Sequence, residues 1–182
     1  MDNVNYNFDC LDALAEGSLK APLPHLFYKP IFLLMTGIIE CTIYDFLKKI
    51  HQHKHERIPN IDERDVHQLQ NIKLPNKLYN FTNICRKYQL LGSDPVLYER
   101  IHEMVEIRNR IHIQNERGIP REEDLWDLPL IQHCGDLFYS VYTIMCLEYP
   151  RPGSHHKSPP MKDFPQPWNS LGHNGIFTPF KP

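Results

Sequence analysis

The sequence predicts an all-α protein, an antiparallel helical bundle of four to five helices with an irregular proline-rich C-terminal tail. Two observations lead to this fold class. Apolar residues recur every three to four positions in several long segments, and no segment shows the alternation of a strand. Of the 16 prolines, half lie at or after position 150, where they exclude a continuous helix. We therefore expect a helical domain over residues 1–149 and an extended tail over residues 150–182.

The first half of the chain predicts one short and one long helix. The short helix covers about residues 9–17 and begins at Asp9, a suitable N-cap. The long helix begins near Pro30 and contains Gly37, which favours a close contact with another helix. Its apolar stripe consists of Ile31, Leu34, Met35, Ile38, Ile39, Ile43, Phe46, Leu47 and Ile50. Glu40 interrupts this stripe, and a membrane-spanning helix needs ~20 mostly apolar residues, so we expect a core helix and no membrane association.

The second half predicts three further helical regions with short connections, which favour antiparallel neighbours. The first covers about residues 61–90 and is broken near Pro75. The next covers about residues 94–115, with Asp94 as its N-cap, and the last covers about residues 127–148. The tail carries five large apolar side chains, so it is expected to wrap back onto the helices or to bind a partner: Phe164, Trp168, Ile176, Phe177 and Phe180.

Composition narrows the classes of function. The net charge of −2 and the pI near 6.6 argue against a strongly basic protein that grips duplex DNA, but they allow a local basic pocket for a short RNA. The five cysteines are odd in number and lack metal-site spacing, and Cys41, Cys134 and Cys146 fall within apolar helical patterns. Because no signal peptide is recognisable either, we expect a cytoplasmic protein without disulfides.

No motif indicates a cofactor or a metal. The sequence lacks a glycine-rich phosphate loop, a serine nucleophile elbow, a metalloprotease helix and a CxxC pair. His51, His53 and His55 alternate at a predicted helix end, and we interpret them as a solvated terminus rather than a metal site. We therefore expect neither a cofactor nor a bound metal.

The helix predicted over residues 94–115 carries the candidate site. On a helical wheel Arg108 and His112 lie about 40° apart in the middle of an apolar face, with Asn109 and Tyr98 at its edge. The apolar residues of that face are Leu97, Ile101, Met104, Val105 and Ile111. An arginine on such a face must be paired or must face a cleft, because an unpaired buried charge is costly. A structural pair with Glu40 is therefore one interpretation, and Asp45 is the other carboxylate that could serve.

The other interpretation is chemical. Arginine offers a planar, permanently charged fork that suits a phosphate, and histidine exchanges protons near neutral pH. Arg108 and His112 together could thus cleave RNA without a metal, by activating the ribose 2′-hydroxyl and stabilising the charge that develops on the phosphate. Tyr98 beside them, and Lys87 in the basic-aromatic segment over residues 86–88, are candidates to hold RNA through stacking and charge.

The string EIRNRIHIQN, residues 106–115, resembles the signature of the HEPN superfamily, small helical bundles with an Arg-Asn…His motif on a late helix. The order of helices over about residues 20–149, including the internal acid Glu40, is similar as well. The resemblance implies a metal-independent endoribonuclease and a homodimer through the helix face that carries Arg108 and His112. It implies that Arg108 binds phosphate, that His112 is the acid or base, and that Asn109 orients the site.

Members of this superfamily serve as toxins or in phage defence, so an RNA substrate and a protein regulator or antitoxin are the implied partners. Only three residues separate Arg108 from His112, one fewer than the family's shortest usual spacing. Other members have lost catalysis and act as binding or dimerisation modules. This alternative therefore stands beside the ribonuclease interpretation.

Overall fold

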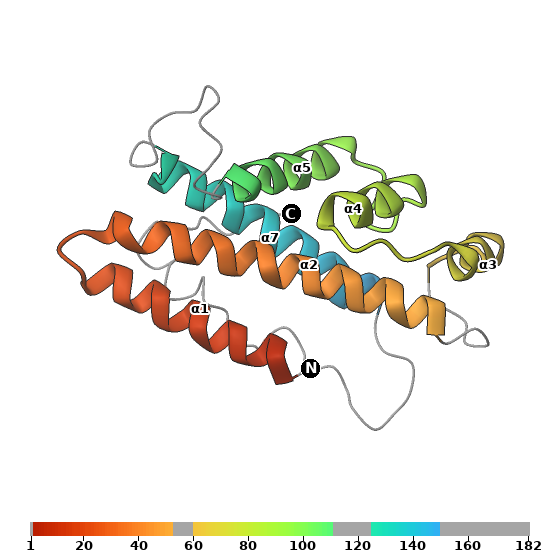
Figure 1. Cartoon of the computed structure of the whole chain (residues 1–182), viewed down its shortest axis with the longest axis horizontal. Helices are drawn as coiled ribbons and strands as arrows, with labels where there is room; N and C mark the ends of the chain where they lie inside the picture. Colours follow the sequence, from red (N-terminus) through yellow and green to blue (C-terminus); the bar gives the residue numbers. More distant parts are fainter. Residues whose placement is uncertain (1, 53–59, 111–124, 150–182) are drawn as a thin grey trace.

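The computed structural model describes residues 2–52, 60–110 and 125–149, and all its regular elements are helical (Figure 1). They are α1 (Asp2–Lys20), a 3-10 helix (Pro24–Phe27), α2 (Tyr28–Gln52), α3 (Glu63–Asn71), α4 (Leu78–Lys87), α5 (Pro95–Arg110) and α7 (Leu128–Glu148). The predicted all-α class is confirmed. The predicted count of four to five helices is not, since the described residues alone contain six α-helices. The predicted tail lies outside these ranges.

The first helix is longer than the sequence predicted. α1 begins at Asp2 rather than Asp9, and its buried residues are Phe8, Leu11, Ala15 and Ser18. The Phe8 ring lies 5.8 Å from the Phe138 ring and 5.4 Å from the Tyr142 ring of α7, so tertiary packing extends this helix beyond its local signals. A Cβ at Gly17 would lie 2.8 Å from the ring of Phe27, which explains the glycine there.

α2 lies at the centre of the molecule and packs against α1, α3, α4, α5 and α7. Figure 1 shows α1 and α2 running in opposite directions, whereas α7 runs in the same direction as α2. Among the described residues, no atom lies within 4 Å of a Cβ built at Gly37, so they do not make the expected close contact there. By length and composition Pro24–Gln52 could also cross a membrane, a test that the core helix of a soluble protein passes equally. Nine of its residues are buried against the other helices.

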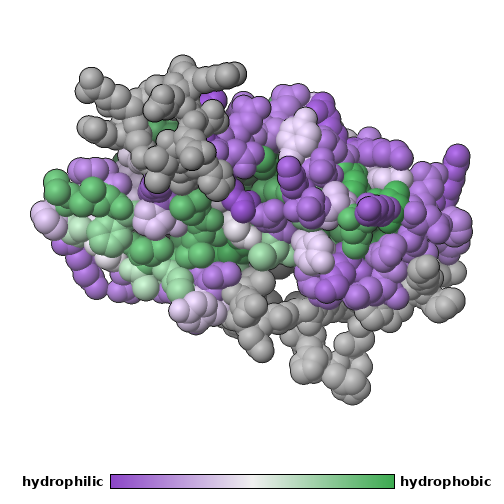
Figure 2. Space-filling model, viewed as in Figure 1, coloured by the Kyte–Doolittle hydropathy of each residue, from purple (hydrophilic) through white to green (hydrophobic). Residues whose placement is uncertain are grey.

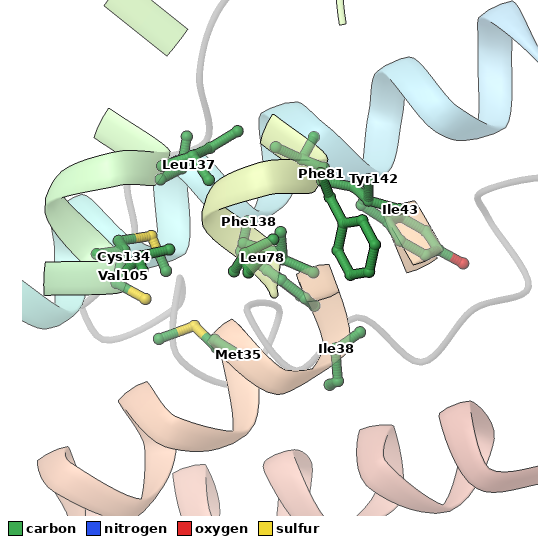
Figure 3. Packing of buried hydrophobic residues seen from close by; sticks show 14 of the residues in the cluster. Met35, Ile38, Ile43, Leu78, Phe81, Val105, Cys134, Leu137, Phe138 and Tyr142 are labelled. Carbon is green, nitrogen blue, oxygen red and sulfur yellow. The ribbon is translucent and has the colours of Figure 1, made fainter. Parts of the chain in front are cut away.

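The hydrophobic core gathers side chains from every long helix (Figure 3). Figure 3 labels ten members of this cluster, from α2, α4, α5 and α7: Met35, Ile38, Ile43, Leu78, Phe81, Val105, Cys134, Leu137, Phe138 and Tyr142. Burial of one large apolar side chain contributes about 1.5–3 kcal/mol, so this cluster supplies the main favourable term in folding. Cys134 behaves as the predicted small hydrophobe, and burial raises the pKa of its thiol well above the usual value.

Polar caps and a tight turn set the boundaries that lead to α5. The predicted break near Pro75 is confirmed, because α3 ends at Asn71 and α4 begins at Leu78. Gly92 adopts a φ of +91° in the turn before α5, a conformation that favours glycine. The Asp94 carboxylate then accepts a hydrogen bond of 2.9 Å from the Val96 amide, so the predicted cap of α5 is confirmed.

Apolar side chains also reach the surface at the turn between α1 and α2. Leu19, Leu23 and Leu26 are 37%, 51% and 65% exposed. Figure 2 shows hydrophobic colour gathered at this end of the molecule, next to a largely hydrophilic face over α4 and α5.

Candidate functional site

The candidate site lies where the last turn of α5 meets the middle of α2. The Arg108 guanidinium donates a hydrogen bond from Nη1 to Oε2 of Glu40, and the two side chains form an ion pair. The Arg108 side chain is 35% exposed and that of Glu40 is 23% exposed. Glu40 is thus the partner, whereas Asp45 pairs with Lys49 one turn along α2.

The position of this pair follows from how the apolar stripe of α5 ends. Tyr98, Ile101, Met104 and Val105 are buried, as the wheel predicts for Ile101, Met104 and Val105. Arg108 occupies the next place in this stripe, where burial gives way to partial exposure. A guanidinium in such a place needs a carboxylate, and α2 supplies Glu40 directly after the buried residue Ile39.

Cys41 borders the ion pair. Its side chain is exposed, contrary to the apolar pattern that suggested a buried thiol, because only one face of α2 at this turn points to the core. Partial desolvation and the Glu40 carboxylate raise the pKa of the Cys41 thiol, while the nearby Arg108 lowers it. The net direction is upward, so the thiol stays protonated at neutral pH and is a poor nucleophile.

The remaining residues of the motif are only partly described. Asn109 is exposed on α5 next to Arg108, and Arg110 is exposed as the wheel predicts. His112 lies outside the described residues. The structure therefore gives a position for Arg108 and Asn109 but not for the histidine that would act with them.

Tyr98 is in a different environment from the one that RNA stacking requires. It is 1% exposed, and its hydroxyl accepts a hydrogen bond of 3.1 Å from the Leu91 amide and donates one of 2.7 Å to the Gly92 carbonyl. Burial also raises the pKa of the Tyr98 phenol. The wheel placed Tyr98 at the edge of the face, but the turn between α4 and α5 covers it. Its role is to fix that turn, and we correct the RNA-binding assignment accordingly.

Lys87 is exposed at the end of α4, as an RNA contact would require. Its Nζ lies 3.1 Å from the Tyr88 hydroxyl and 4.7 Å from the centre of the Tyr88 ring. The Tyr88 hydroxyl in turn donates a hydrogen bond of 3.2 Å to Oε1 of Gln68 on α3. Lys87 is therefore a surface cation that also supports the contact between α3 and α4.

Sequence reasoning missed two residues that lie in line with Glu40 on α2. Tyr44 is 39% exposed, and its ring lies 5.5 Å from the Phe81 ring of α4. Lys48 places its Nζ 5.7 Å from the centre of the Tyr44 ring. The signal was the spacing of four residues from Glu40 to Tyr44 and from Tyr44 to Lys48, which the description of α2 as a pure core helix overlooked.

The described residues contain no group of three or more histidine, cysteine, aspartate or glutamate side chains that could hold a metal ion. His51 is partly buried near the end of α2, with its Nδ1 enclosed. His53 and His55 lie outside the described ranges, so the structure describes only His51 of the three histidines in the predicted solvated terminus.

Comparison with known proteins finds no family model, no curated protein and no solved structure that matches this chain. The HEPN resemblance stays a prediction.

Proposed function

We propose that this chain is a HEPN-like, metal-independent endoribonuclease. The observation that carries the proposal is the state of Arg108: one edge of its guanidinium is held by Glu40, yet the side chain is 35% exposed. A guanidinium that is fixed by a carboxylate and still reaches solvent is pre-organised to bind a phosphate through its remaining N–H groups. A fully enclosed arginine could not do so.

The proposed reaction uses the three motif residues in distinct roles. The base, His112, takes the proton of the ribose 2′-hydroxyl, and the 2′-oxygen attacks the adjacent phosphorus. The bond from phosphorus to the 5′-oxygen breaks, the leaving oxygen takes a proton, and a 2′,3′-cyclic phosphate remains. Arg108 stabilises the negative charge that develops on the phosphate, and Asn109 orients the site.

The proposed assembly is a homodimer. Since Tyr98, Ile101, Met104 and Val105 pack inside their own chain, a second copy would meet α5 at its C-terminal end, where Arg108 lies. Two motifs would then share one cleft, and the second histidine would supply the proton for the leaving oxygen. A cytoplasmic toxin or defence effector with a protein regulator is the corresponding biological role.

The decisive experiment is cleavage of labelled single-stranded RNA by purified protein in EDTA. We expect cutting that yields cyclic-phosphate ends and that is lost in His112→Ala and Arg108→Lys. Matched controls are His67→Ala and Arg110→Lys, since both residues are exposed and lie outside the proposed roles. Cleavage that persists unchanged in His112→Ala would show that the proposal is wrong.

A non-catalytic dimerisation or binding module is the second candidate. The observation in its favour is that Glu40 already neutralises Arg108 within one chain, as a purely structural pair would. This candidate predicts that no RNA is cut under any condition. It also predicts that Arg108→Ala lowers the midpoint of thermal unfolding or loosens the dimer in sedimentation experiments.

A further inference from the structure

We infer that α2 carries a track for single-stranded RNA, formed by Tyr44 and Lys48, which leads away from the pair of Arg108 and Glu40. The inference rests on the proposed function, because the track would present the strand to Arg108. It names the surface that holds the substrate and the form of RNA that fits it.

The residues of the track are evenly spaced along α2. Glu40, Tyr44 and Lys48 follow one another at intervals of four residues, and side chains at this interval are neighbours on a helix, about 5–6 Å apart at Cβ. They therefore form one row that starts at the ion pair with Arg108. Along α2 the row thus offers, in order, the carboxylate that holds Arg108 of α5, a ring for a base and a cation.

The Tyr44 ring is supported on one side and partly exposed on the other. α2 buries nine residues, yet Tyr44 leaves 39% of its surface in solvent. The Phe81 ring backs it at 5.5 Å with an interplanar angle of 48°, so the phenol is held in place while part of it stays open. A supported, partly exposed ring is a platform on which a base can stack, and stacking is available to every base.

The charged side chains around Tyr44 leave Lys48 available for a phosphate. The acidic residues of this segment are neutralised, because Glu40 pairs with Arg108 and Asp45 pairs with Lys49. Lys48 pairs with no carboxylate of the described residues and instead lies over the Tyr44 ring. Its long side chain can move from the ring to a phosphate when a base takes its place. The row is therefore complementary to a polyanion that also carries flat rings.

The exposed leucines at the turn between α1 and α2 form a second exposed surface. This patch carries no comparable arrangement of ring and cation, and nothing in the structure shows what covers it (Figure 2). Duplex RNA fits the row on α2 poorly, since its bases are already stacked on one another and unavailable to Tyr44. Single-stranded RNA is the occupant to which we commit.

The test measures binding of fluorescein-labelled oligouridylate to full-length protein that carries His112→Ala, so that the RNA stays intact. We expect Tyr44→Ala to weaken binding about 5- to 150-fold, the range for one lost stacking platform, and Tyr44→Phe to retain it. The matched control is Tyr6→Ala on α1, since Tyr6 is 68% exposed and far from the row in sequence. Circular dichroism of each variant shows whether the fold is intact.

Lys48 allows a second measurement, the salt dependence of RNA affinity, which would not change if Lys48 had only a structural role. Each phosphate contact with single-stranded nucleic acid adds about 0.7 to the slope of log affinity against log salt concentration. Lys48→Gln should reduce this slope by about 0.7, whereas Lys20→Gln on α1 should leave it unchanged. Lys20 is an exposed cation on a different helix, whereas Lys48 is partly exposed on α2.

In the same His112→Ala protein, Cys41 provides a footprint that needs no substitution on α2. It is exposed and lies three residues before Tyr44 on α2, so bound RNA should slow its alkylation by a maleimide at mildly alkaline pH, where part of this thiol is ionised despite its raised pKa. Cys10 on α1 is the internal reference, and peptide mapping separates the two sites. Protection of Cys41 without protection of Cys10 supports the track.

The outcomes separate this inference from the proposed function. If His112-dependent cleavage is found but Tyr44→Ala and Lys48→Gln bind RNA like their controls, the track is overturned and the ribonuclease stands. Equal affinity for duplex and single-stranded RNA also overturns the track. If the wild-type protein neither binds nor cuts RNA, both proposals fail together.

Discussion

Breaking the ion pair of Glu40 and Arg108 should destabilise the protein by more than a surface pair and by less than a buried one. Exposed pairs contribute about 0.2–1 kcal/mol, while loss of one partner of a fully buried pair costs about 3–5 kcal/mol. With side chains 23% and 35% exposed, this pair lies between these limits. We expect Glu40→Gln, which keeps the shape and removes the charge, to lower the free energy of unfolding by about 1–2 kcal/mol.

A double-mutant cycle isolates the coupling between the two side chains. Glu40→Gln, Arg108→Gln and the double variant are unfolded in urea, and the coupling energy is the departure from additivity. We expect a coupling of about 1–2 kcal/mol, and a fall of about 3–6 °C in the melting temperature for a loss of 1.5 kcal/mol in a chain of this size.

The matched control is the pair of Lys20 and Glu16 on α1. Its side chains are 77% and 53% exposed and four residues apart, so its coupling should be about 0.3–0.5 kcal/mol. If the coupling of Glu40 and Arg108 is no larger than this control, the pair is a surface contact. This result would refute the inference that Glu40 holds the Arg108 guanidinium in a partly desolvated environment.

Three further predictions concern the helices that support the site. Tyr98→Phe removes a buried hydroxyl that bonds two backbone groups of the turn before α5, so urea unfolding should show a loss of about 1–3 kcal/mol, and no loss would mean that water replaces the hydroxyl. Asp127→Ala removes the N-cap of α7 and should cost about 1 kcal/mol in the same assay, with Asp127→Asn close to wild type. Partial burial raises the pKa of Asp136 on α7, so its ionised form is less favourable in the folded state than in the unfolded one. The free energy of unfolding that Asp136 contributes therefore falls as pH rises from the unfolded pKa toward the raised folded pKa. Asp136→Asn should be more stable than wild type at pH 7 but not below a pH of about 3.9. Equal stability of the two proteins at pH 7 would contradict a raised pKa.

Local sequence patterns predicted the main helices and the position of Arg108 in an apolar face, but not how the helices pack against one another. The spacing of apolar residues located α2, α5 and α7 to within a few residues, because helices bury one face at a period of 3.6. The start of α1 was missed because it depends on Phe8 packing against α7, which no local signal encodes. The count of helices failed for a related reason, since α1 and the short helices α3 and α4 gain their stability from the core.

The sequence by itself determined that Arg108 interrupts the apolar face of a helix and needs a partner, since this follows from helical periodicity and from the cost of an unpaired charge. Only the tertiary structure decided that the partner is Glu40, 68 residues away, rather than Asp45. Only the fold could show that Tyr98 is buried beneath a turn while Tyr44 is exposed. Both tyrosines lie on helices with apolar stripes, and which side of a helix meets water depends on the neighbours that pack around it.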